Sequence, residues 1–222
     1  MSHHITFKTL SEQQTPTPIE ALAAANLVPA AITSFKISRV ADNKNDGEIT
    51  FGYAASPVFL VSLTRYLSRA LDTSKFDTNT LITLDNVNQK GFWEANMDAV
   101  TVNGKDVGLK GRTAILDTGT TLIIAPAKDA AAVHAAIPGS ASDGQGGFTI
   151  PCTSTVKVAL SFGKQSFGID TRDILVQPVD PKNPDGECIS GIASGNVGGA
   201  TEWLVCIDNL PRLPHIDLVS GR

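Results

Sequence analysis

Residues 113–121, which read TAILDTGTT, have the residue types and spacing that could do chemistry. Apolar residues lead up to Asp117, and small polar residues follow it. Gly119 lets the chain take an unusual φ or approach another group closely, while the neighbouring threonine hydroxyls can donate to the carboxylate or to the backbone. A carboxylate held in this way is rigid. The alternative is an Asx-type turn, in which Asp117 only caps the residues that follow it.

The segments around this motif are mainly strand-like. Short runs rich in Ile, Val, Thr and Phe are separated by Gly, Asp and Asn clusters, which is typical of a mainly β protein. An Asn-Gly step between two apolar runs, in residues 102–105, predicts a β-hairpin.

Helices are predicted in two places. The Ala-rich run at 126–139 begins with Pro126, carries Asp129 in its first turn and ends in a Pro-Gly step, so it predicts a helix. A second helix is expected over 17–28. Residues 177–187 are dense in Pro, Asp and Asn, and they predict a surface loop rather than a linker between domains.

Composition excludes several classes of protein. The 222 residues, 42% of them hydrophobic, suffice for one large domain or two small ones. A net charge of −4 and a pI of about 5.5 argue against nucleic-acid binding. The longest apolar run, at 57–63, is far shorter than the roughly 20 residues of a membrane-spanning helix. The start of the sequence shows no secretory signal, and we expect a soluble protein without a membrane partner.

Neither metal nor another cofactor is expected. The four histidines share no spacing typical of metal ligands; they are His3, His4, His134 and His215.

Three cysteines leave either three free thiols or one pair and an unpaired residue. Cys152 and Cys188 lie in similar surroundings, beside turn formers and β-branched residues, and we favour their pairing. Cys206 would then be unpaired. The pairing implies an oxidising compartment; three reduced, partly buried thiols are the alternative.

Several longer stretches resemble one known family. AILDTGTTLIIAP, AAAVHAAIPG, FTIPC and GGATEWLV look like the C-terminal lobe of the pepsin-like aspartic peptidases secreted by fungi. SFKISRVADNKNDGEITFG resembles the strand pair that crosses between the two lobes of that family, and GFWEANMDAVTVNG resembles the stretch that leads into the second catalytic strand. TFKTLSEQQTPTPIEAL resembles the end of the N-terminal lobe. The resemblance assigns 1–34 to the remnant of an N-terminal lobe and 35–222 to a C-terminal catalytic lobe.

The resemblance implies a mainly β fold: a single lobe of a pepsin-like acid protease with one or two short helices, incomplete relative to the family. The interval of 36 residues between Cys152 and Cys188 suits the disulfide of that lobe. The implied localisation is secreted or vacuolar.

The resemblance also implies a mechanism. In this family two aspartates, one from a D-[TS]-G loop in each lobe, share a proton and titrate as a pair. One accepts a proton from water while the other donates to the substrate carbonyl, without a metal or a covalent intermediate. Asp117 matches the C-terminal-lobe aspartate, Thr118 and Gly119 match residues that brace the paired loops, and Thr120 and Thr121 match hydroxyls beside a peptide or protein substrate.

The sequence departs from the family pattern in its first half. It has no earlier D-[TS]-G and no tyrosine-bearing flap, so a second lobe or a second copy of the chain would have to supply the other aspartate. In LDTSKF, Asp72 and Thr73 are followed by Ser74 where the motif has glycine, and we interpret Asp72 as structural. Residues 53–70, which begin with Tyr53 and contain Tyr66, form an insertion that the family lacks. We interpret it as a translated intron, with a partner-binding amphipathic hairpin as the alternative.

The end of the chain, 206–222, also departs from the family, which has a glycine where Cys206 stands. A side chain there is expected to strain or shift Asp117. Pro211 and Pro214 argue against a central strand in this segment. Two carboxylates of this segment are therefore poor candidates for the second catalytic acid and are expected in a solvated loop; they are Asp208 and Asp217.

Two functions of different classes are consistent with these residues. The first is an aspartic-type endopeptidase, with this chain holding one half of the catalytic pair. The second is a catalytically inactive lobe with at most weak peptide binding.

Overall fold

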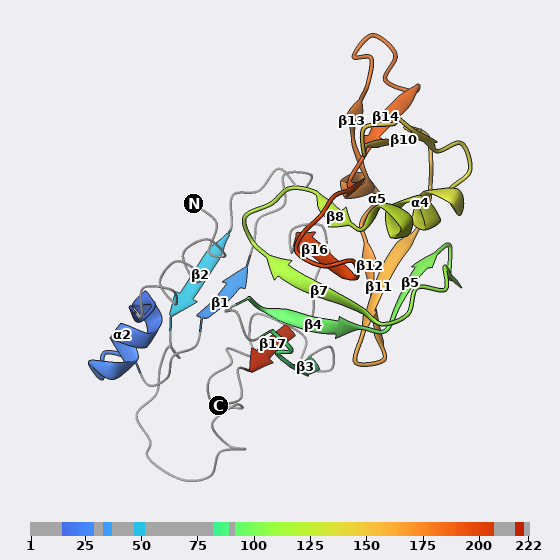
Figure 1. Ribbon diagram of the computed structural model, residues 1–222. Helices are drawn as coiled ribbons and strands as arrows, with labels where there is room; N and C mark the ends of the chain where they lie inside the picture. Colours follow the sequence, from blue (N-terminus) through green and yellow to red (C-terminus); the bar gives the residue numbers. More distant parts are fainter. Residues whose placement is uncertain are drawn as a thin grey trace.

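The computed structural model describes residues 15–28, 33–36, 47–51, 82–88, 92–206 and 216–219. Three helices are formed within these ranges: α2 (Pro18–Ala24), α4 (Ala127–Ala135) and α5 (Thr171–Ile174). The strands, in chain order, are β1 (Thr33–Lys36), β2 (Glu48–Phe51), β3 (Ile82–Asp85), β4 (Glu94–Met97), β5 (Ala99–Val102), β6 (Lys105–Asp106), β7 (Arg112–Asp117), β8 (Ile123–Ala125), β9 (Ala141–Ser142), β10 (Phe148–Pro151), β11 (Val158–Phe162), β12 (Gln165–Ile169), β13 (Leu175–Pro178), β14 (Glu187–Ser190), β15 (Ile192–Ser194), β16 (Glu202–Cys206) and β17 (Ile216–Val219). The expected mainly β fold is confirmed (Figure 1).

The largest sheet contains the strand that ends at Asp117. Its strand order is β15-β8-β16-β7-β4, with β16 parallel to β7 and β4 antiparallel to it. Two further sheets have the orders β12-β11-β5-β6 and β13-β14-β10-β9, while β1 pairs with β2 and β17 with β3. Figure 1 shows β13 and β14 rising from the rest of the described chain as a protruding hairpin.

One face of the five-stranded sheet packs on the hydrophobic core. Because side chains alternate between the two faces of a strand, Ala114 and Leu116 of β7 enter the core, together with Trp203 and Val205 of β16. The core also contains residues of α4, β5, β11 and β12. Asp117 therefore lies on the opposite face of the sheet from the core.

Local sequence signals account for several elements. The predicted hairpin forms between β5 and β6, with Asn103 at φ 50° and Gly104 at φ 78°, the positive values that a two-residue I′ turn requires. The helix predicted over 126–139 is α4, and the helix predicted over 17–28 is α2, which begins with a capping box between Thr17 and Glu20.

Helix α5 was not predicted from the sequence, and the prediction for Asp217 was wrong. Helix α5 is only four residues long, too short for a periodic pattern, and its N-cap Asp170 accepts from the Arg172 amide. Asp217 was expected in a solvated loop, but it lies on β17, which pairs in parallel with β3. Pro214 precedes this strand and the strand itself contains no proline, so its backbone is free to pair.

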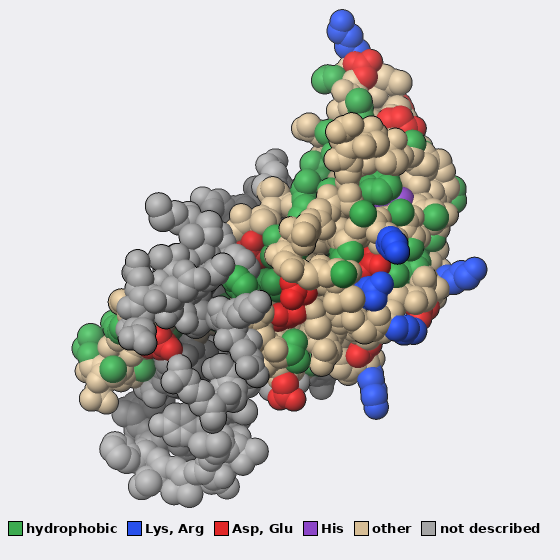
Figure 2. Space-filling model, in the orientation of Figure 1, with side chains coloured by type: hydrophobic (Ala, Val, Ile, Leu, Met, Phe, Trp, Pro, Cys, Tyr) green, Lys and Arg blue, Asp and Glu red, His purple; other side chains and the backbone are tan. Residues whose placement is uncertain are grey.

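The loop expected over 177–187 is the exposed tip of the β13–β14 hairpin, although its first and last residues belong to the strands. Figure 2 shows charged side chains at this tip, where Asp180 and Lys182 are exposed. The boundary expected at 34/35 stays a prediction. Several positions singled out in the sequence lie outside the described residues; they are 53–70, Asp72, Asp208, Pro211 and Pro214.

The expected disulfide is confirmed. Cys152 and Cys188 are bonded, with 4.9 Å between their Cα atoms, and Cys206 is a buried cysteine that takes no part in the disulfide. Cys188 lies on β14 and Cys152 directly follows β10, so the bond joins two neighbouring strands of one sheet and closes a long loop that would otherwise gain entropy on unfolding.

A buried ionic cluster ties α4 to β7 and β16. The Asp129 carboxylate, 1% exposed, accepts from Arg112 Nε at 2.5 Å and Nη2 at 2.8 Å, and from Trp203 Nε1 at 3.0 Å. Burial alone would raise the pKa of Asp129, but the hydrogen bonds from Arg112 and Trp203 outweigh burial and hold this pKa below its ordinary value.

The cluster predicts how stability depends on Asp129. Asp129→Asn should lower the free energy of unfolding by about 3 kcal/mol near neutral pH, because the Arg112 guanidinium, whose side chain is 21% exposed, loses its counter-charge. The contribution is complete above the unfolded pKa of about 3.9 and is lost as pH falls through the lower folded pKa. Urea unfolding of both proteins as a function of pH measures the difference.

Asp106→Asn is the matched control, because Asp106 forms an exposed ion pair with Lys110 and such pairs contribute little. Equal losses of stability in the two variants would contradict the assigned role of the buried cluster. So would a difference in the free energy of unfolding between the wild type and Asp129→Asn that persists unchanged to the lowest pH.

Candidate active site

Asp117 is the last residue of β7, the strand between β16 and β4 in the largest sheet. Its side chain is 4% exposed. The turn that follows is more open, because Gly119 and Thr121 are exposed while Thr118 and Thr120 are half-buried. The carboxylate is thus shielded itself but borders an exposed edge of the protein.

The turn after β7 holds the carboxylate locally. The Gly119 amide donates to Asp117 Oδ1 at 3.0 Å, which is the Asx-type contact that the sequence suggested. This hydrogen bond from the Gly119 amide fixes the direction of the side chain. The Asx turn and a chemical role are therefore compatible at this residue.

Thr120 has one satisfied and one unsatisfied polar group. Its carbonyl oxygen accepts from Cys206 Sγ. Its hydroxyl Oγ1 is shielded from solvent and has no hydrogen-bond partner within the part of the chain that the structure describes. A buried hydroxyl without a partner costs about 1–3 kcal/mol, and such groups are common where a ligand or another segment completes a site.

Cys206 is the register partner of Asp117. The parallel pairing of β16 with β7 continues to its last pair, Cys206 with Asp117, and Cys206 is fully buried. A displacement of Asp117 by this side chain was expected, but the pairing of the two strands is uninterrupted. The thiol instead donates to the Thr120 carbonyl, so it closes the turn from the side of β16.

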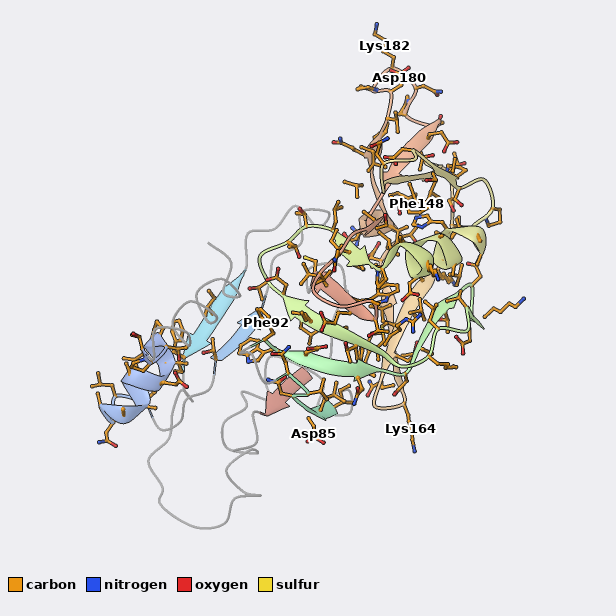
Figure 3. All side chains as sticks on the ribbon, viewed as in Figure 1. Asp85, Phe92, Phe148, Lys164, Asp180 and Lys182 are labelled. Carbon is orange, nitrogen blue, oxygen red and sulfur yellow. A yellow bond between two sulfur atoms is a disulfide. The ribbon has the colours of Figure 1, made fainter. Side chains whose placement is uncertain are left out.

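The other neighbour of β7 contributes groups that sequence reasoning missed. The Leu116 amide donates to the Trp93 carbonyl at 2.9 Å, and β4 pairs Glu94 with Ile115. Extending this register places Phe92 opposite Asp117, and Figure 3 shows Phe92 near the end of β7. The buried Glu94 carboxylate accepts from Asn88 Nδ2 at 2.5 Å. A charged residue inside the otherwise apolar start of GFWEANM was the available signal.

No metal centre is formed by the described residues, which contain no group of three or more His, Cys, Asp or Glu side chains placed to hold an ion. The face of the described chain seen in Figure 2 carries its acidic and basic side chains scattered among neutral ones. Within the same residues, no helix has the length and apolarity to cross a membrane.

The fold agrees with comparisons to known proteins. A family model described as eukaryotic aspartyl protease matches residues 4–204. The chain therefore belongs to the eukaryotic aspartyl protease family, whose members are pepsin-like.

Its relatives include named fungal enzymes. The probable aspartic-type endopeptidase CTSD of Arthroderma benhamiae is 33% identical over 193 residues, covering 86% of this chain and 33% of the relative. The aspartic-type endopeptidase ctsD of Aspergillus fumigatus is 31% identical over 196 residues, covering 88% of this chain and 36% of the relative. Rhizopuspepsin of Rhizopus chinensis is 32% identical over 161 residues, covering 68% and 39%. The chain spans about a third of the length of the CTSD relative from Arthroderma benhamiae.

The Cys206 thiol provides a test of how the turn is held. Cys206→Ala removes the donor to the Thr120 carbonyl and should lower the free energy of unfolding by about 1 kcal/mol, with faster amide hydrogen exchange in residues 118–122. Cys206→Ser retains a donor and should stay closer to the wild type. Chemical unfolding combined with hydrogen exchange measures both effects; equal behaviour of the serine and alanine variants would show that the hydrogen bond does not hold the turn.

Proposed function

We propose that this chain is the part of an aspartic-type endopeptidase that supplies Asp117 as one of two catalytic carboxylates. The observation that carries the proposal is the Asp-Thr-Gly turn at the end of β7 in a chain of the aspartyl protease family, with a shielded carboxylate beside an exposed edge. Its relatives are named as endopeptidases.

In the proposed mechanism Asp117 and a second carboxylate share one proton, because two neighbouring carboxylates resist simultaneous ionisation. One of them accepts a proton from a water molecule, which attacks the peptide carbonyl, and the other donates its proton to the carbonyl oxygen. The tetrahedral intermediate then collapses, the peptide C–N bond breaks, and the leaving nitrogen takes up a proton. The second carboxylate comes from another lobe or from a second copy of the chain.

The residues after Asp117 receive supporting roles. Thr118 and Gly119 brace the loop against its counterpart, and Thr120 and Thr121 present hydroxyls to the reacting groups. The unsatisfied Thr120 Oγ1 supports this assignment, because a buried hydroxyl gains a hydrogen bond when a partner completes the site. The substrate is a peptide or protein; no nucleic acid, membrane or cofactor takes part.

We further propose a secreted or vacuolar location. The Cys152–Cys188 disulfide supports it, since such bonds persist in oxidising compartments.

Substitution of the reacting acid tests the proposed function. The purified chain should cleave a protein substrate at about pH 3–5, a statine-type inhibitor should abolish the cleavage, and Asp117→Asn should reduce it by about 10²-fold or more because proton transfer is lost. Asp185→Asn, which changes an exposed carboxylate at the hairpin tip, is the control and should retain full activity.

Cleavage that survives Asp117→Asn would contradict the role of this carboxylate. The absence of any inhibitor-sensitive cleavage by the wild-type chain would show that a second copy does not supply the other carboxylate. The chain by itself would then be the alternative, a catalytically inactive lobe with at most weak peptide binding.

A further inference from the structure

His134 occupies an unusual place for a titratable residue. It lies in the last turn of α4 and is 2% exposed. Its ring stacks on Phe148 of β10, with 3.8 Å between ring centroids and 7° between planes; Figure 3 shows Phe148 beside α4. The imidazole thus joins the helix to the sheet that carries the disulfide.

The partners of His134 indicate which of its ring nitrogens carries a hydrogen. Nδ1 lies 2.7 Å from the Ala130 carbonyl oxygen, which can only accept, so Nδ1 carries a hydrogen. Nε2 lies 2.9 Å from Ser190 Oγ, and that oxygen already accepts from the Ile192 amide at 3.1 Å. With its hydrogen on Nδ1, a neutral ring accepts at Nε2 from the Ser190 hydroxyl, and burial, which lowers the pKa of His134, favours this neutral form.

Gly191, the residue after Ser190, contacts the chain directly after the turn that follows Asp117. The Gly191 carbonyl accepts from the Ile123 amide at 2.9 Å, and Ile123 begins β8 directly after the turn at 118–122. Gly191 is also tightly seated, because a Cβ on it would lie 2.1 Å from the Asp173 carbonyl oxygen. A shift of Ser190 is therefore transmitted to the end of the turn that follows Asp117.

We propose that neutral His134 is a positioning residue for the Asp117 turn, acting through Ser190 and Gly191, and that protonation of its ring weakens this anchor. A proton on Nε2 would make that atom a donor, so the Ser190 hydroxyl hydrogen would have to turn away from it. The buried ring would then also carry a charge without a counter-charge.

The charged groups around His134 do not offset this effect. On α4 itself, Asp129 is engaged by Arg112 and Trp203, and Lys128 is exposed. Among the described elements that pack against the helix or the ring, β5, β8, β10 and β15 contain no charged residue, and β14 contributes only the exposed Glu187. Burial lowers the pKa of His134, against the smaller opposing effect of the hydrogen bond to the Ala130 carbonyl.

The lowered pKa of His134 determines how the stability of the fold depends on pH. In the unfolded chain the ring takes up a proton at about pH 6.5, whereas the folded chain keeps it neutral to lower pH. Between the folded and the unfolded pKa of His134 the unfolded state binds more protons, so the free energy of unfolding falls as pH falls. Below the folded pKa the ring is charged in the folded protein as well, and the anchor is weakened there.

Amide hydrogen exchange, followed by NMR from about pH 8 to about pH 4, tests the inference. After correction for the intrinsic exchange rate, the protection of the Ile192 and Ile123 amides should fall about tenfold as pH falls. The midpoint of this fall should coincide with the midpoint at which the His134 ring signals titrate. His134→Phe keeps an aromatic ring against Phe148 and cannot titrate, so its exchange should show no such step. Ser140→Ala removes the hydrogen bond from Ser140 Oγ to the His134 carbonyl without touching the ring, and should retain the step.

Three results would overturn the inference. They are a titration of His134 without a change at Ile123, a step that persists in His134→Phe, and a ring that stays neutral until the protein unfolds. The inference rests on the proposed function only in taking Asp117 as the reacting acid. The exchange measurement needs no activity, so the positioning role and the proposed function can fail separately.

Discussion

The buried charge of Asp129 is the interaction on which the arrangement around Asp117 depends. A carboxylate removed from water is costly unless donors compensate it fully, and here the donors come from the start of β7 and from β16. Helix α4 and the two parallel strands are therefore held together at one end of the sheet. From there the pairing of β7 with β16 continues to Asp117 and Cys206, so a cluster at the start of the strand determines where the carboxylate at its end lies.

At its far end the turn is held by contacts of a different kind. The Asp117 carboxylate accepts from the Gly119 amide, the Thr120 carbonyl accepts from the Cys206 thiol, and the Ile123 amide donates to Gly191. These contacts come from the turn itself, from β16 and from the segment before β15. The turn after Asp117 is thus restrained from three directions. Under the proposed function, the carboxylate would need little rearrangement to react, which is the advantage of a preorganised site.

The sequence predicted those features whose cause is local. The Asn-Gly hairpin, helix α4 and the mainly β pattern each follow from residues adjacent in the chain, and the disulfide followed from similar surroundings and from the family resemblance. Helix α5 is too short for a pattern, and β17 depends on pairing with a distant strand. Asp129 was recognised only as an acid in a first turn, because its partners Arg112 and Trp203 lie 17 and 74 residues away. His134 was considered only as a metal ligand, since its partner Ser190 is 56 residues away.

Asp129 and His134, two of the buried titratable residues in the described part of the chain, impose opposite charge requirements that respond alike to acid. Asp129 must be ionised and His134 must be neutral, so each folded arrangement is opposed by added protons. The histidine responds first, below about pH 6.5, and the aspartate only below about pH 3.9. A carboxylate pair that shares a proton works in acid, between or below these limits. The hydrogen bonds from Arg112 and Trp203 that lower the pKa of Asp129 therefore extend the acidic range over which the sheet can hold Asp117 in place, even after the anchor at Ser190 has weakened.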